Sequence, residues 1–388
     1  MVSRMVRRRN TRVEQRTTTL ELFYDLVFVF AITQVSHLLL AHLSWTGAGE
    51  AVLALLVVWW SWNYTTWTTN ELDPDVMLVR VLLLALMLAS LLMAVAIPDA
   101  FGDRALLFAV SYVAIQLGRH TFLTFVAAPA GTLERERAGQ ILIWFGAAGV
   151  FWIGGALAEG TGRVALWLIA LGIDYAAPIV TFWVPGRTRM RPEMWQVGSS
   201  HFAERFQLFI ILALGETIVI TGATTSELEL GPARLVAFSL AFLGTAAFWW
   251  LYFTSAYRIG EEQLEAVRER TTLARDAYTY LHGLIAAGII VAAVGDELVI
   301  AHPTETLERP ELVVVVAGPI LYLLAQTLFR HRVLGRWSRG CLLGAVACAA
   351  VGLAGMVAPA MMVSALLVAV LAGVIAGERV SWGGVPAA

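Results

Sequence analysis

Long apolar segments follow one another along almost the whole chain, and they constrain the fold more than any other feature. Each is close to the roughly 20 residues that an α-helix needs to cross the hydrocarbon of a bilayer. Of the 388 residues, 59% are hydrophobic and only 14% are charged, against about 25% in soluble domains. The sequence therefore predicts an all-α, polytopic integral membrane protein. We expect about twelve transmembrane helices, near residues 19–40, 47–69, 77–97, 104–127, 138–158, 163–185, 202–222, 233–256, 272–295, 311–330, 339–357 and 360–377.

The basic residues predict the orientation of these helices. All 27 are arginines, and cytoplasmic loops of membrane proteins carry an excess of positive charge. With the N-terminus inside, most arginines fall in the N-terminal tail, the inner loops and the C-terminus. We therefore expect a multi-pass protein whose two termini are cytoplasmic. The partner that this predicts is the lipid bilayer. The outer loops then hold only Arg104, Arg163, Arg234 and Arg309.

Several classes of protein are excluded or disfavoured. A Walker phosphate loop needs a lysine, and the chain has none. Cys341 and Cys348 lie seven residues apart in one predicted helix, about 10 Å, which is too far for a disulfide. No cysteine pattern predicts structural zinc. We expect no cofactor, no bound metal and no nucleic-acid partner; a homo-oligomer is left open.

The first apolar segment carries two acids, although acids inside a membrane are costly and usually face protein or water. Glu21 and Asp25 are spaced i, i+4 and share one face of the helix, with Gln34 further along. One interpretation is that the acids pair with arginines and lock helices together. The other is a cation-binding or proton-carrying cluster at an inner vestibule. The arginines expected at the same depth are Arg80, Arg119, Arg205 and Arg275.

The seventh segment holds a second group of polar residues. His201, Arg205 and Glu216 fall near one face of this helix, because 11 residues make about three turns. Glu216 is expected beyond the membrane middle, where a carboxyl group tends to be protonated or to bind a cation; a hydrogen bond to a neighbouring helix is the alternative. His201 and Glu204 have a spacing that suits a metal, but one such pair is a weak signal.

Asp174 is expected near the middle of the sixth segment, one turn before Pro178. Proline cannot donate to the carbonyl four residues earlier, so Pro178 leaves that of Asp174 free. An acid beside a broken helix is typical of ion sites in transporters, whereas a tilted helix would bring Asp174 nearer an interface. His282 shares a face with Arg275 and can relay protons. Hydrogen bonds between helices explain such embedded polar residues more often than ligands do; the others are His37, Asn63, Gln116 and Gln326.

The two halves of the chain repeat the same landmarks in the same order. Six spans per half is an even number, so both halves have the same orientation, as in transporters built from parallel repeats. We divide the chain into a basic tail (1–17), a first six-helix repeat (18–190), a second (191–379) and a short C-terminal tail (380–388). The landmarks are Ala31–Gln34 with Ala213–Glu216, Trp59 and Trp60 with Trp249 and Trp250, Arg80 with Arg275, and Arg119 and His120 with Arg330 and His331.

Two stretches resemble the signature motifs of the bacterial low temperature requirement A family of multi-spanning membrane proteins. They are T-T-L-E-L-F-Y-D-L-V-F-V-F-A-I-T-Q from Thr18 and H-F-A-E-R-F-Q-L-F-I-I-L-A-L-G-E-T-I from His201. The resemblance covers nearly the whole chain and implies a bacterial plasma membrane, but the family has no agreed molecular activity. Phe23, Tyr24 and Asp25 also resemble the Phe-Ser-Asp motif of endolysosomal potassium channels, although Tyr24 replaces the serine and the seventh segment has no matching aspartate.

Three functions fit these features. A transporter or channel for a small cation, a proton or another polar solute is favoured, because acids are expected at the inner, middle and outer depths of the membrane. A stress-related scaffold or sensor is the alternative. An enzyme that acts on lipids is disfavoured, because it would need a clustered nucleophile, base or metal site. For the favoured function the candidate site residues are Glu21, Asp25, Gln34, Asp174, His201, Glu204, Arg205, Glu216 and His282.

Overall fold

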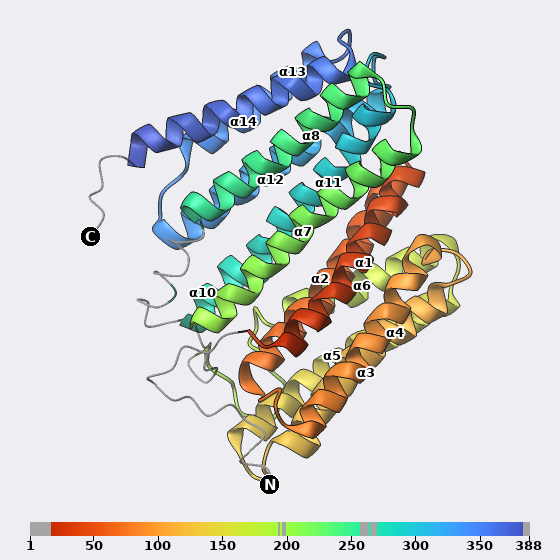
Figure 1. The fold of residues 1–388 in the computed structure, drawn as a ribbon. Coiled ribbons are helices and arrows are strands. Elements are labelled where there is room, and N and C mark those ends of the chain that lie inside the picture. Colours follow the sequence, from red (N-terminus) through yellow and green to blue (C-terminus); the bar gives the residue numbers. More distant parts are fainter. Residues whose placement is uncertain (1–16, 193–194, 196–198, 257–263, 265–269, 383–388) are drawn as a thin grey trace. The chain divides into compact units, whose positions relative to one another are not determined.

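The computed structural model describes residues 17–192, 195, 199–256, 264 and 270–382, and these residues are almost entirely helical (Figure 1). Most of the predicted tail, 1–17, and residues 383–388 therefore lie outside the described part of the chain. The helices are α1 (Thr19–Ala41), α2 (Trp45–Glu71), α3 (Met77–Ala96), α4 (Ala105–Phe122), α5 (Leu133–Leu157), α6 (Gly160–Ala176), α7 (Ser199–Glu227), α8 (Pro232–Leu251), α10 (Arg270–Leu273), α11 (His282–Ala301), α12 (Arg309–Leu334), α13 (Arg339–Ala354) and α14 (Ala360–Trp382).

Each of the twelve predicted segments coincides with one of these helices, so the all-α class is confirmed. Among the described residues, nine helices are long and apolar enough to cross a membrane. One of these nine runs from Arg270 to Ala301 and includes both α10 and α11. The three helices outside this set are α2, whose second half is rich in tryptophan, threonine and asparagine, and the short α6 and α13, of 17 and 16 residues. The protein is therefore of the multi-pass membrane class, while the prediction of twelve membrane crossings stays a prediction.

Local sequence signals explain several helix ends. The Thr132 hydroxyl accepts a hydrogen bond from the Arg135 amide at the start of α5, and Ser338 does the same for Cys341 at the start of α13. A reciprocal capping box joins Glu308 and Glu311 at the start of α12. Gly335 ends α12 in the left-handed conformation, at φ 69°, which glycine adopts without strain.

The predicted ends of two helices differ most from the structure. Helix α6 ends at Ala176, not near 185, because Pro178 lacks an N–H group and the following turns place Thr181 and Phe182 at a φ of 53°. Helix α11 continues to Ala301, beyond the expected end at 295, because Leu298–Ala301 resume the apolar pattern. As a result Asp174 lies in the last turn of α6 and not in the middle of a helix.

The chain divides into two compact units. Unit 1 comprises Met1–Leu38, Gly49–Arg205 and Arg268–Arg275, and unit 2 comprises Leu39–Ala48, Phe206–Val267 and Asp276–Ala388. In unit 1, α3 packs on α4, α4 on α5 and α5 on α6. Large aromatic side chains fill its core, among them Trp60, Trp62, Trp152 and Trp167, each less than 2% exposed.

In unit 2, α11 packs on α12, α12 on α13, α13 on α14, and α8 on both α11 and α14. Glycines bring α11 and α12 very close together. A Cβ atom on Gly288 would lie 2.6 Å from the Tyr322 amide nitrogen, and one on Gly318 would lie 2.5 Å from that of Ala292. Small residues that allow this approach are typical of packed helices in membranes.

Among the described residues, three segments have π-helical hydrogen bonding, η3 (Leu123–Ala127), η5 (Tyr252–Ala256) and η6 (Ala274–Leu281). Such segments are rare and frequently occur at functional sites. Segment η6 leads directly into His282, whose ring nitrogen Nδ1 lies 3.0 Å from the Ala277 carbonyl oxygen, five residues earlier. The π-helical segment thus orients a buried histidine in unit 2.

Candidate functional site

A capping box fixes the start of α1. The Thr18 hydroxyl lies 3.4 Å from the Glu21 amide nitrogen, and the Glu21 carboxylate accepts the Thr18 N–H at 2.9 Å. The Glu204 carboxylate accepts the neighbouring Thr17 N–H at 2.9 Å. Negative charge at a helix N-terminus is favourable, because unsatisfied N–H groups and the helix dipole both attract it. Two of the candidate acids therefore hold the first turn of α1 within unit 1.

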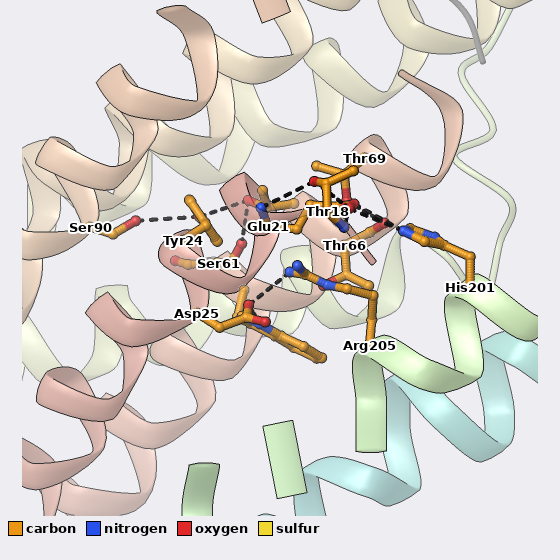
Figure 2. A network of polar contacts seen from close by, with 12 residues as sticks. Thr18, Glu21, Tyr24, Asp25, Ser61, Thr66, Thr69, Ser90, His201 and Arg205 are labelled. Atoms are coloured by element: carbon orange, nitrogen blue, oxygen red, sulfur yellow. Dashed lines mark hydrogen bonds and ion pairs between the residues drawn. The ribbon is translucent and has the colours of Figure 1, made fainter. Parts of the chain in front are cut away.

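His201 lies against the Glu21 carboxylate (Figure 2). Its Nε2 is 3.1 and 3.3 Å from the two carboxylate oxygens of Glu21, and both side chains are fully buried. A carboxylate can only accept, so Nε2 carries the hydrogen. His201 and Glu204 thus contact different groups, and the weak metal-binding spacing is not realised as a shared site.

One turn further along α1, Asp25 is held by two donors. The Arg205 guanidinium and the Trp62 indole N–H each donate to its Oδ1 at 2.8 Å. The guanidinium also lies over the Trp62 ring, 5.9 Å from its centre. Arg205 is one of the four arginines expected at the depth of the acids, whereas Trp62 was not among the expected donors. Figure 2 shows Arg205 of α7 pointing toward Asp25.

This ion pair is only half satisfied. Asp25 Oδ2 and Arg205 Nε and Nη1 are buried and have no hydrogen-bond partner among the described residues. Asp25 and Arg205 are 1% and 0% exposed. Burying a charge costs several kcal/mol, which hydrogen bonds to all its polar atoms normally offset. The pair therefore keeps one acceptor and two donors that a polar molecule or an ion can use.

Unit 1 contains another buried arginine, Arg119. Unlike Arg205, it has no acidic partner among the described residues. Arg119 of α4 is fully buried; it donates to the Thr65 hydroxyl at 2.9 Å and also contacts the Gln116 side-chain oxygen. Thr65 in turn shares a hydrogen bond with the Tyr24 hydroxyl at 2.9 Å. The Tyr24 hydroxyl is also 3.4 Å from that of Ser90 (Figure 2). Hydroxyl groups thus connect Arg119 to the residue beside Asp25.

Asp174 belongs to a separate cluster of buried polar side chains in unit 1, contributed by α4, α5 and α6. Tyr112 donates its hydroxyl to Asp174 Oδ2 at 2.7 Å, and the Trp152 indole donates to the same oxygen at 3.0 Å. Asp174 is 1% exposed, and its Oδ1 has no partner among the described residues. Because Tyr112, Gln116 and Arg119 follow one another at four and three residues, they form a buried polar stripe on α4.

Two candidates lie in unit 2. Glu216 is buried in α7, 1% exposed. His282 is also buried, and both of its ring nitrogens have partners. A carbonyl only accepts, so Nδ1 donates to Ala277, and Nε2 accepts from the Tyr252 hydroxyl at 2.9 Å. The Tyr278 ring stacks on the imidazole with ring centres 4.7 Å apart. In this geometry His282 is a satisfied core histidine, and its use as a proton relay stays a prediction.

The remaining polar residues differ in exposure. Gln34 is partly exposed and His37 is exposed, both in the membrane-length helix α1, whereas Asn63 is buried. The Gln116 and Gln326 side chains make hydrogen bonds within their own helices, to Arg119 and Tyr322, and not the predicted bonds between helices. The extension of α11 also places Asp296 and Glu297 inside a membrane-length helix. Sequence analysis missed both, although the apolar residues after them were a signal.

These features define a multi-pass helical membrane protein with charged groups buried between its helices. Residues 16–376 match the family described as bacterial low temperature requirement A protein, and the chain belongs to that family. The predicted resemblance is thus confirmed. A relative, an uncharacterized protein of Rhizobium meliloti (strain 1021), is 39% identical over 318 residues, which are 81% of this chain and 77% of the relative. No solved structure matches the chain.

Proposed function

We propose that this protein carries a small ion or polar solute across the bacterial plasma membrane. The observation that carries the proposal is the half-satisfied pair of Asp25 and Arg205, buried where α1 and the start of α7 meet in unit 1. A pair with a purely structural role gains stability when all of its polar atoms are bonded. Here one carboxylate oxygen and two guanidinium nitrogens have no described partner and are available to a solute.

Asp174 supports the same function. Its Oδ2 is held by two neutral donors and its Oδ1 has no described partner. Ionisable groups inside membrane segments commonly mark ion pathways. In the proposed mechanism Asp25 and Arg205 bind the solute, and Asp174 provides a second carboxyl group. Glu216 of unit 2 is a further candidate for ion binding.

The test is ion flux into proteoliposomes under gradients of potassium, sodium and protons. Wild type is compared with Asp25→Asn, Asp174→Asn and Glu216→Gln, and Asp103→Asn is the control because it removes an exposed carboxylate. We expect flux in wild type and in the control, and at least a tenfold loss in Asp25→Asn with an unchanged melting temperature. Equal flux in empty and protein-containing vesicles for every cation would refute cation transport.

The alternative is a scaffold or sensor in which the ion pair only holds helices together. Glu21 favours it, because the capping box and His201 give that acid a structural role. The exchange of Asp25→Arg with Arg205→Asp separates the two functions. A structural pair would lose stability in each single variant and regain both stability and function in the exchange. A solute-binding pair would regain stability only.

We also propose the two-repeat architecture, with repeats 18–190 and 191–379 in the same orientation and with both termini cytoplasmic. One landmark supports it, since Arg119 and Arg330 are both buried, near the ends of α4 and α12. The tryptophan landmarks differ, because Trp59 and Trp60 are buried while Trp249 and Trp250 are 46% and 37% exposed. The repeats would thus share a backbone plan and not every side-chain environment.

A further inference from the structure

A pocket of about 670 Å³ opens on unit 1 where η3 meets the start of α5. Two arginines line it, Arg135 of α5 and Arg187 of the segment after α6. Apolar side chains line it as well, including Phe125 and Ile143, which are 61% and 42% exposed. Exposed apolar side chains on a membrane-length helix are suited to contact acyl chains.

The acid in this pocket is already engaged. The Glu136 carboxylate accepts the Thr188 backbone N–H at 3.1 Å, which ties the segment carrying Arg187 to the first turn of α5. Arg135 lies over the Phe125 ring, 5.5 Å from its centre. Neither arginine forms a salt bridge with an acid among the described residues, although the Glu136 carboxylate interacts electrostatically with Arg187. The pocket therefore presents two guanidinium groups and one carboxylate beside an apolar wall, and its net charge is positive.

We propose that this pocket binds the phosphate of an anionic phospholipid. Arg135 and Arg187 contact the phosphate, while the acyl chains lie along Phe125, Leu142 and Ile143. Basic pockets at the cytoplasmic ends of membrane helices are suited to anionic headgroups, and a guanidinium matches a phosphate with two parallel hydrogen bonds. The apolar wall favours a lipid over free phosphate. This inference does not depend on the proposed transport.

The test is lipid retention measured by native mass spectrometry of the purified full chain. The protein is titrated with phosphatidylglycerol or phosphatidylcholine of equal chain length, and a separate arm contains inorganic phosphate alone. We expect wild type to prefer phosphatidylglycerol. The double variant Arg135→Gln with Arg187→Gln should bind it about thirtyfold more weakly, since each arginine near an anionic lipid contributes about a fivefold effect.

A charge-matched control uses Arg189→Gln with Arg336→Gln, two exposed arginines outside the pocket. It should retain phosphatidylglycerol as wild type does. Arg187→Gln alone, in the exposed segment, should weaken the binding of phosphatidylglycerol to a value between those of wild type and the double variant. The protein should keep its elution volume and melting temperature. Equal retention of the two lipids by wild type, or an equal loss in the control, would overturn the proposal. Inorganic phosphate that binds alone and displaces the lipid would show a site for soluble phosphate instead.

Discussion

Trp62 and Arg205 together determine what Asp25 can do. Both donate to one oxygen of the carboxylate, and the other oxygen has no described partner. Hydrogen bonds to charged groups contribute about 1.5–3 kcal/mol, roughly twice the value for neutral pairs. The hydrogen bond from the Trp62 indole to Asp25 should therefore contribute more to stability than a tryptophan hydrogen bond to a neutral group in the core.

The first prediction concerns this indole. Trp62→Phe removes the indole N–H, while the phenyl ring fills most of the space of the indole. We therefore expect the free energy of unfolding to fall by about 2–4 kcal/mol. Trp167→Phe is the matched control, because its indole is equally buried but donates to the neutral Trp152 carbonyl at 3.0 Å. Melting in detergent measures both. If the control melts at a lower temperature than Trp62→Phe, the charged hydrogen bond is not the larger contribution.

Also at the scale of residues, the role of Glu21 at the start of α1 was predictable from the sequence. Thr18-x-x-Glu21 has the spacing of a capping box, a local signal that predicts a helix start. The partners of Asp25 had no such signal, since Trp62 and Arg205 lie 37 and 180 residues away. Four arginines were possible partners of the acids, and only the packing of the helices selects among them.

At the scale of elements, α11 and α12 approach each other backbone to backbone at glycines. The second prediction is that Gly318→Ala destabilises unit 2 by about 1–3 kcal/mol or more, because the added Cβ meets the Ala292 backbone at 2.5 Å and a helix backbone cannot give way. Gly373→Ala is the control, with no atom within 4 Å of its Cβ, and should be neutral or stabilising. Unchanged melting of Gly318→Ala would contradict the observed approach of the two helices.

The end of α6 shows how one residue alters a whole element. Pro178 is a local signal that sequence analysis used to predict a free carbonyl, but the segment was still expected to run to 185. The helix instead ends at Ala176, and the chain turns through two residues of positive φ. Non-helical backbone near a buried acid is tolerated when polar groups find partners within the protein. The Trp183 carbonyl, for example, accepts the Trp144 indole N–H at 3.1 Å.

At the scale of the molecule, the third prediction concerns orientation. Cys341 and Cys348 are both buried, so single added cysteines can be labelled in intact cells against a low background. A membrane-impermeant maleimide should label Asp103→Cys and Glu229→Cys, one predicted outer loop in each half. It should not label Arg189→Cys or Arg336→Cys, which lie in predicted inner loops and are exposed.

Two results would contradict parts of this topology. The reverse labelling would place both termini outside and refute the arginine-based orientation. Labelling of Asp103→Cys without Glu229→Cys would mean that the halves have opposite orientations, which six crossings per half do not allow. Labelling after the cells are opened checks that all four cysteines are reactive.

The sequence by itself determined the class of the protein, its family, and the positions of twelve helices to within a few residues at most ends. Apolar length and periodicity, proline, glycine and capping residues act over a few neighbouring positions, so they are legible along the chain. Tertiary structure alone decided the partners of the buried charges. It joined Asp25 to Arg205 and Trp62, and Asp174 to Tyr112 and Trp152. Such pairs depend on which helix faces meet, and no local pattern specifies that.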